Sequence, residues 1–569
     1  MRIKTMVIKK NDIIELKITD IGVNGEGIGK YEGCTFFVKD ALSGDEVKAV
    51  VTKMKKDYGY AKMLEILKPS PGRVPPFCEN ARRCGGCQIM ELKYSEQLRL
   101  KERKVRNNLE KIGGFKNPEI LPIIGMSEED CRILDPLSDN PDCVPTRYRN
   151  KMQFPIGRDR DGNLAAGFYA GRTHSIINTE DCSIAPEPLN RILHGVKAFL
   201  KEYKIPVYNE QTGQGLVRHL VLRMGFRTGE IMVCLVINGE SLNDNNYSHN
   251  VDYESAFVDK LRNLPLFCGC KVHKPLKIES ICVNINRENT NVILGKEIRC
   301  IYGRPFIYDE IVNKEDESRL RYKISPLSFY QVNPVQTEKL YAKALEFAGL
   351  SGNETVWDLY CGTGTISLFL ARKAKQVMGV EIVPEAIRDA KENAAQNGIE
   401  NAIFFCGKSE EIFPEYIKML KKTISNESPE TAIPGPSAAF DSAEEQNTVA
   451  VPVPPEEQDT VVVLDPPRKG CDRKLLDAIL EAAPEKIVYV SCDSATLARD
   501  LKILTDPENQ NSRYLIQKIQ PLDMFPNSVH VETVCLLSNR KPDARVKIDV
   551  DLEDYYRIKD EQKKNKASE

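Results

Sequence analysis

The stretch Ile487–Asp493, IVYVSCD, decides the fold that we expect. A β-branched apolar run ends at Cys492, and the helix-like stretch SATLARDL follows. This pattern predicts a buried parallel strand that delivers one thiol to its carboxyl end, where ligands and catalytic groups of open α/β sheets gather. The alternative for a lone cysteine is a place in the core, because free Cys is among the most buried residue types.

Upstream, the stretch TVWDLYCGTGTISLFLA from Thr355 predicts a strand, a glycine loop and a helix. Gly362 and Gly364 let the backbone come close to a ligand at a helix N-terminus. The third glycine of the dinucleotide fingerprint is absent, which disfavours a nicotinamide cofactor. Glu381 ends the next strand, 21 residues after Tyr360, where an acid can accept hydrogen bonds from ribose hydroxyls. The apolar runs of this region predict a sheet of seven strands, of which the last is antiparallel. Together with the glycine loop and the acid, this sheet favours S-adenosylmethionine as the cofactor.

The fourth strand ends in Asp465-Pro-Pro-Arg468. Methyltransferases that act on exocyclic amines place an aromatic residue after the prolines, so Arg468 favours a ring carbon as the target. The C5 carbon of a pyrimidine is a poor nucleophile until a thiolate adds to C6, and a base must later remove the C5 proton. Cys492 supplies the thiol and Glu532 is the candidate base; its alternative is an exposed surface glutamate. The position before a helix N-terminus predicts a depressed pKa for the thiol.

The length of 569 residues predicts about three domains. Residues 13–67 alternate short apolar runs with glycines, which predicts a small β-barrel, and Lys53, Lys55 and Lys56 beside Tyr58 and Tyr60 are typical of oligonucleotide-binding barrels. Residues 69–76 are proline-rich and mark a boundary. Residues 94–112 have helical periodicity with a basic face, and strands dominate from residue 148 to about 301.

Cys78, Cys84 and Cys87 form a C-x5-C-x2-C array that can converge on one metal centre, with Cys182 as the candidate fourth ligand. Zinc and a [4Fe–4S] cluster both accept four thiolates, and the spacing does not choose between them. The C-x-C pair Cys268 and Cys270 has no second pair and is interpreted as incidental. Seventeen cysteines without an export signal favour a reducing cytosol.

The net charge of −2 is unevenly distributed. Residues 1–115 hold 23 Lys/Arg against 15 Asp/Glu, whereas residues 425–460 hold eight acids and no base. This asymmetry fits a polyanionic partner approached from one side, or equally an ordinary scatter of surface charge. Residues 425–459 are predicted to be a disordered insertion and residues 127–146 a loop. No apolar run approaches the roughly 20 residues that span a bilayer.

The motifs VWDLYCGTG, VLDPPRKG, YVSCDSATLARDL and MFPNSVHVETVCLL, with the cysteine array, closely resemble the RNA (uracil-5-)-methyltransferase family, and most of all its 23S rRNA branch. The resemblance covers nearly the whole chain. It implies an N-terminal OB-like TRAM barrel at 1–68, a central α+β iron–sulfur domain at 69–320, a class I, Rossmann-like α/β methyltransferase domain at 321–540 and a tail at 541–569.

Carried over by motif, Cys492 matches the family's nucleophile and Glu532 its base. The matches to S-adenosylmethionine contacts are Gln331, Tyr360, Thr365, Glu381 and Asp465. The matches to the ligands of a [4Fe–4S] cluster are Cys78, Cys84, Cys87 and Cys182. Two positions depart from the family: Asp493 replaces an Asn after the nucleophile, and Lys408 stands where an Asp or Asn contacts the cofactor.

The expected function is therefore methylation of C5 of a uridine in 23S rRNA through a covalent cysteine–uracil adduct. The expected enzyme is a cytoplasmic monomer that binds RNA and no membrane. The alternatives are a tRNA uracil-5 methyltransferase with the same mechanism, and a non-catalytic RNA-binding assembly factor with the same fold. An oxidoreductase that uses the iron–sulfur centre is disfavoured by the missing third glycine.

Overall fold

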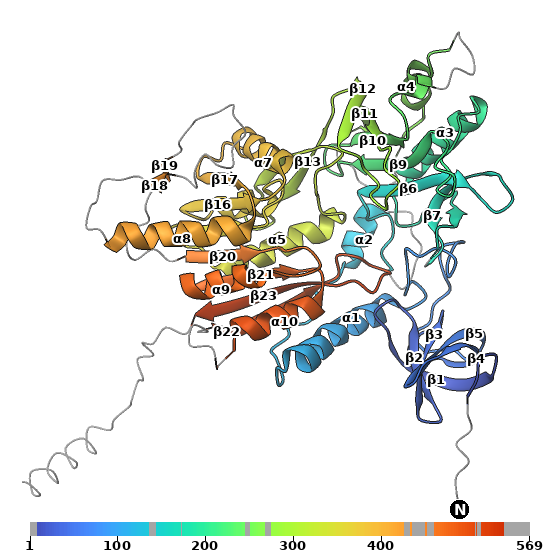
Figure 1. Ribbon diagram of the computed structural model, residues 1–569, viewed down its shortest axis with the longest axis horizontal. Helices are drawn as coiled ribbons and strands as arrows, with labels where there is room; N and C mark the ends of the chain where they lie inside the picture. Colours follow the sequence, from blue (N-terminus) through green and yellow to red (C-terminus); the bar gives the residue numbers. More distant parts are fainter. Residues whose placement is uncertain are drawn as a thin grey trace, which may run out of the picture.

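The computed structural model describes residues 8–135, 144–171, 173–244, 251–267, 275–425, 433–434, 450–451, 460–506, 508 and 514–539 (Figure 1). The pair Cys268 and Cys270, the tail 541–569 and most of the insertion 425–459 lie outside these residues. Within the insertion, β18 (Ile433–Pro434) and β19 (Ala450–Val451) pair antiparallel. No helix in the described part of the chain is long and apolar enough to cross a membrane.

Five strands close an N-terminal barrel in the order β1-β2-β3-β5-β4, at the lower right of Figure 1. They are β1 (Ile13–Ile21), β2 (Gly27–Tyr31), β3 (Cys34–Lys39), β4 (Glu46–Met54) and β5 (Tyr58–Lys68). In β1 the buried residues Ile14, Leu16 and Ile18 alternate with exposed ones, as expected for a strand with one face in a core. The predicted barrel is confirmed.

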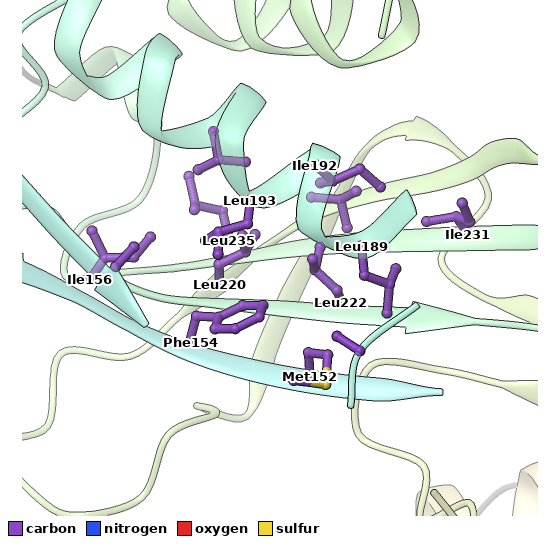
Figure 2. Packing of buried hydrophobic residues seen from close by; sticks show 14 of the residues in the cluster. Met152, Phe154, Ile156, Leu189, Ile192, Leu193, Leu220, Leu222, Ile231 and Leu235 are labelled. Atoms are coloured by element: carbon purple, nitrogen blue, oxygen red, sulfur yellow. The ribbon is translucent and has the colours of Figure 1, made fainter. Parts of the chain in front are cut away.

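The central sheet has the strand order β12-β11-β10-β9-β6-β7-β8. Its strands are β6 (Lys151–Arg158), β7 (Leu164–Tyr169), β8 (Ile176–Asn178), β9 (Val217–Met224), β10 (Glu230–Ile237), β11 (Lys277–Ile285) and β12 (Glu297–Gly303). The helices α3 (Glu187–Glu202) and α4 (Tyr253–Arg262) pack on it. Figure 2 shows the apolar side of α3 lying on the sheet, which removes both surfaces from water.

Helix α1 (Tyr94–Asn108) and the π-helical turn Leu109–Gly113 form the predicted basic helix. Val105 and Leu109 are fully buried, and they join the core formed by the C-terminal sheet rather than that of the central sheet. The loop predicted at 127–146 is wrong in its first part, because α2 (Glu128–Leu134) forms there. Ser127 and Asp130 make reciprocal side-chain to backbone hydrogen bonds, a capping box that starts this helix.

The C-terminal sheet has the order β17-β16-β15-β20-β21-β23-β22. Its strands are β15 (Thr355–Leu359), β16 (Gln376–Glu381), β17 (Ala402–Cys406), β20 (Thr460–Leu464), β21 (Lys486–Ser491), β22 (Tyr514–Leu522) and β23 (Glu532–Asn539). β23 runs antiparallel to β21 and β22, whereas β15, β16, β17, β20 and β21 are parallel. The first residue of β23 therefore lies at the edge where the parallel strands end.

Helices cover both faces of this sheet. On one face lie α5 (Pro334–Ala348), α6 (Thr365–Ala371) and α7 (Pro384–Gln396), and on the other α8 (Ser409–Ser425), α9 (Arg473–Ala482) and α10 (Ser494–Leu504). The hairpin of β13 (Ile307–Val312) and β14 (Arg319–Ile324) packs beside α6 and α7. Buried on both faces, the parallel strands consist of apolar runs such as Val461–Leu464. The doubly wound α/β class is confirmed.

Candidate active site

Cys492 and Glu532 lie close together at the carboxyl edge of the sheet. The antiparallel register of β21 and β23 pairs Ser491 with Thr533. Cys492 directly follows Ser491 and Glu532 directly precedes Thr533, so both residues reach the same edge of the sheet, and the charge of Glu532 acts on the thiol of Cys492. Cys492 is half-buried, and Glu532 is only 3% exposed. The structure therefore brings together the two residues predicted to do the chemistry.

The pKa of the Cys492 thiol is raised to about 11, which contradicts the expected depression. Burial is the largest cause, and the neighbouring acids Glu532 and Asp465 raise the pKa further. Arg468 acts in the opposite direction but does not offset them. The helix N-terminus is satisfied by Asp493, whose side chain accepts a hydrogen bond from Ala495 N at 2.8 Å. Asp493 therefore caps α10, a role that the Asn expected at this position fills equally well.

The carboxyl group of Glu532 is buried without a full set of partners. Its Oε2 has no hydrogen-bond partner among the described residues. Burial raises the pKa of Glu532 to about 8, Asp465 adds to the rise and Arg468 reduces it. Burial, followed by the charge of Asp358, raises the pKa of Asp465 to about 7. An uncompensated buried acid is costly, and such groups are concentrated at functional sites.

The glycine loop after β15 is shaped by three residues with left-handed backbone. Tyr360, Gly362 and Gly364 have φ of 85°, 57° and 79°, and Gly364 caps α6. Glu381 braces the loop, because its two oxygens accept hydrogen bonds from Gly362 N at 3.2 Å and Val383 N at 3.0 Å. The loop and the helix N-terminus behind it fit a nucleoside cofactor.

The remaining predicted cofactor contacts have mixed surroundings. Thr365 is buried, and its hydroxyl accepts a hydrogen bond from Tyr341 at 2.8 Å. Gln331 is 5% exposed, and its backbone carbonyl accepts a hydrogen bond from Asn150 Nδ2 at 2.8 Å. Lys408 pairs with Glu411 at 2.7 Å. These bonds hold the segments that carry the residues, and they leave the contacts themselves as predictions.

Sequence reasoning missed two apolar side chains beside the glycine loop. Ile382, directly after Glu381, is 56% exposed, and Phe329 is 66% exposed. The carbonyl of Phe329 accepts a hydrogen bond from Thr363 of the loop at 3.4 Å. Exposed apolar groups at such a position can contact the flat face of a base. The signal for Ile382 was its place after the strand-end acid, but its exposure is not visible in the sequence.

The four predicted cysteine ligands line one cavity of about 60 Å³, together with Phe77, Met90 and Arg149. Burial and the mutual repulsion of the thiolates raise the pKa of Cys84, Cys87 and Cys182, the last to about 12. No group of three or more His, Cys, Asp or Glu in the described ranges is arranged to hold a single metal ion. A zinc ion would need sulfur atoms roughly 3.8 Å apart, from four bonds of about 2.3 Å in a tetrahedron. The four thiols share one cavity, and the group that they would hold stays a prediction.

Three protein families match parts of the chain. Residues 9–64 match the TRAM domain, residues 350–449 a methyltransferase domain, and residues 456–540 the tRNA (Uracil-5-)-methyltransferase family. A protein from Clostridium tetani named "Uncharacterized RNA methyltransferase" is 40% identical over 94% of this chain and 98% of its own length. A similarly named protein from Clostridium acetobutylicum is 41% identical with the same coverage.

Among solved structures, the tRNA (uracil-54, C5)-methyltransferase of Pyrococcus abyssi in complex with S-adenosyl-L-homocysteine is similar, with a TM-score of 0.62 and 25% identity. The match covers 92% of this chain and 100% of that one. The fold, the glycine loop and this neighbour support binding of S-adenosylmethionine. The chain therefore belongs to the RNA uracil-5-methyltransferase family, as a methyltransferase with an N-terminal TRAM domain.

Proposed function

We propose that this enzyme methylates C5 of a uridine in RNA through a transient bond between Cys492 and the base. The observation that supports this proposal is the pair at the sheet edge. The thiol of Cys492 lies near the buried carboxyl of Glu532, whose charge acts on it, and Oε2 of that carboxyl has no partner among the described atoms. A protein keeps such an unpaired acid at a cost in stability, which is typical of a group that serves function.

The proposed roles follow from the chemistry of uracil. When bound, S-adenosylmethionine supplies the methyl group and a positive sulfonium. Cys492 Sγ, as the thiolate, adds to C6, and the electron pair moves to C5 and the C4 carbonyl as an enolate. After C5 has accepted the methyl group, Glu532 removes the C5 proton. Elimination then breaks the C6–S bond, restores the ring double bond and frees the thiolate.

The charges around Cys492 and Glu532 suit a reaction that starts only after the cofactor has bound. With pKa values of about 11 for Cys492 and about 8 for Glu532, both groups hold their protons at neutral pH in the free enzyme. Arg468 is the cation that lowers both pKa values. A positive charge held near Asp465 acts in the same direction, because it favours the charged form of each acid.

The test of this function uses RNA that contains 5-fluorouridine, in which the C5 proton is replaced by fluorine. With S-adenosylmethionine, wild-type protein should form an adduct that survives denaturation and maps to Cys492. The variant Cys492→Ala should lose methylation and adduct while RNA binding is largely retained. Full turnover by Cys492→Ala, or no adduct with wild-type protein, would overturn the mechanism.

We propose 23S rRNA as the substrate, on the basis of the motifs that resemble the rRNA branch of the family. A tRNA is the second candidate, because the similar Pyrococcus abyssi protein is a tRNA (uracil-54, C5)-methyltransferase. Mass mapping of rRNA and tRNA from cells that lack the gene separates the two. Loss of a 5-methyluridine from 23S rRNA supports the first, and loss from tRNA alone replaces it with the second.

The outer face of the barrel supports RNA binding. Phe37, Tyr58 and Tyr60 form a cluster in which each pair of ring centroids is 5.6 Å apart. Phe37 of β3 pairs with Tyr60 of β5, and the exposed Lys53 of β4 pairs with Tyr60 from the other side. Lys62 continues the same face of β5 and is exposed. Aromatic rings flanked by lysines provide stacking for bases and charge for phosphates.

We also propose that Cys78, Cys84, Cys87 and Cys182 hold a [4Fe–4S] cluster. The shared cavity and the apolar setting of the thiols support this, since such clusters are ligated by four cysteines. Protein purified without air should show broad visible absorbance and about four irons per chain. Stoichiometric zinc would contradict the proposal.

The proposed organisation is a monomer with domains at 1–68, 69–320 and 321–540. The proposed location is the cytoplasm, and the free-thiol state of all fourteen cysteines in the described residues agrees with a reducing compartment. Size-exclusion chromatography with light scattering tests the monomer, and a mass corresponding to two chains would overturn it.

A further inference from the structure

Residues 523–531, between β22 and β23, end directly before Glu532. This segment contains no helix or strand, yet most of it is buried. Its backbone carbonyls are satisfied by groups from distant parts of the chain. The carbonyls of residues 523, 524, 525, 526, 527 and 529 each accept one such hydrogen bond. Their donors, in that order, are Gln336 Nε2 at 3.0 Å, Asn333 Nδ2 at 3.2 Å, Lys101 Nζ at 2.9 Å, Tyr148 OH at 2.9 Å, Ile89 N at 3.0 Å and Lys104 Nζ at 2.9 Å.

Asn527 is the centre of this arrangement. It is fully buried and has a left-handed backbone, with φ of 68°. Its backbone N–H donates to Gln97 Oε1 at 2.8 Å, and its Oδ1 accepts from Gln97 Nε2 at 3.2 Å. Its Nδ2 donates to Pro145 O at 2.9 Å, and its carbonyl accepts from Ile89 N. All four polar groups of Asn527 thus bond to residues outside the segment.

Gln97 of α1 is the partner that makes two of these bonds. It is fully buried, and its Nε2 also donates to Leu92 O at 3.0 Å. Lys101, one turn further along α1, adds an ion pair with Asp523. Because buried backbone groups must be paired, these side chains determine which conformation the segment can adopt. Helix α1 therefore sets the path of the chain into β23.

The position of the Glu532 carboxyl depends on that path. Its Oε2 has no partner among the described residues, so its own hydrogen bonds do not anchor the side chain fully. Removal of a proton from C5 needs the carboxylate within hydrogen-bond reach of that position. A displacement of about 1 Å at a reacting group can lower a rate by about 100-fold.

We propose that Gln97 and Asn527 are positioning residues for the removal of the C5 proton, which they serve by clamping residues 523–531 and thereby placing Glu532. This inference rests on the proposed function, in which Glu532 is the base. In this proposal α1 contributes to one step of the reaction, the removal of the C5 proton that follows methyl transfer. Addition of the thiol and transfer of the methyl group do not require the clamp.

The test uses two variants chosen to keep the fold. Gln97→Met is close to isosteric and removes the hydrogen bonds of the amide, and Asn527→Gly keeps the left-handed backbone without the side chain. Each should lower kcat about 10- to 100-fold, with KM within about twofold, because the defect lies after substrate binding. With RNA deuterated at C5 of uridine, the isotope effect on kcat should rise above the wild-type value. A methylated adduct with Cys492 should accumulate.

The matched control is Asn284→Ala in the central sheet. Asn284 is also fully buried, and its side chain makes three hydrogen bonds, to the carbonyls of Gly295 and Glu297 and from Gly295 N. This variant can lower stability, but it should keep the wild-type isotope effect. The isotope effect does not depend on how much of the protein is folded, so a loss of folded enzyme does not imitate the predicted result.

The variant Glu532→Gln tests the role of Glu532 as the base separately from the positioning role of Gln97 and Asn527. If this variant gives no methylated adduct with ordinary RNA, the proposed function of Glu532 fails. If it accumulates the adduct while Gln97→Met and Asn527→Gly show the wild-type isotope effect and none of the adduct, the positioning role is overturned and the proposed function stands.

Discussion

Replacing Glu532 by glutamine should stabilise the folded protein at alkaline pH, and the difference in stability should shift in favour of the variant as pH rises. Burial raises the pKa of Glu532 from 4.5 to about 8. Between these values the native state keeps a proton that the unfolded chain has released, so the unfolding free energy of the wild-type protein falls as pH rises. At about 1.4 kcal/mol for each factor of ten, the loss approaches about 5 kcal/mol above pH 8.

Glutamine carries no charge and avoids this loss. Its buried amide lacks partners, which costs about 1–3 kcal/mol. The expected net gain is therefore about 2–4 kcal/mol at pH 9, the loss that glutamine avoids less the cost of its amide. Below pH 4.5 the carboxyl is protonated in both states, so no loss is avoided and the variant should be less stable than the wild type by the cost of its amide, about 1–3 kcal/mol.

Thermal unfolding of the two proteins without cofactor or RNA, from pH 5 to pH 9, measures this difference. For a domain of roughly 200 residues, about 1 kcal/mol shifts Tm by about 2–4 °C, so Tm should rise by about 5–15 °C at pH 9. The control Glu385→Gln alters an exposed glutamate of α7 and should show little difference at any pH. A difference that stays constant or shrinks as pH rises would refute the assignment of Glu532 as a buried, unpaired acid.

Three further predictions concern the thiol of Cys492, the aromatic face of the barrel and the cavity lined by cysteines. Alkylation of Cys492 by iodoacetamide should be slow below pH 9, because burial raises the thiol pKa to about 11. The variant Glu532→Gln should be alkylated faster at pH 9, because it lacks a neighbouring negative charge. Mass spectrometry of the labelled peptide measures both rates. Tyr58→Ala should weaken RNA binding by about 1–3 kcal/mol with an unchanged salt dependence, whereas Lys62→Ala should reduce the salt slope by about one, as titrations at several salt concentrations will show. Cys182→Ser should abolish the visible absorbance of protein purified without air, and absorbance equal to that of the wild type would exclude Cys182 as a ligand.

The sequence by itself determined the features that depend on local pattern. Short apolar runs separated by glycines predicted the barrel, and the apolar run before Cys492 predicted a strand that ends in a thiol. The glycines after Leu359 predicted the loop that caps α6. Each of these follows from the conformational preferences and the periodicity of neighbouring residues, which a linear chain displays directly.

Only the tertiary structure decided what these features meet. Cys492 and Glu532 are 40 residues apart in the chain, and the antiparallel insertion of β23 beside β21 brings them to the same edge of the sheet. The thiol pKa is raised rather than depressed because packing removes water and gathers acids around it, and neither effect is written in the residues next to Cys492. Likewise, Gln97 reaches Asn527 across 430 positions. Burial and charge proximity depend on which surfaces pack together, and that choice is made by the whole chain rather than by any one segment of it.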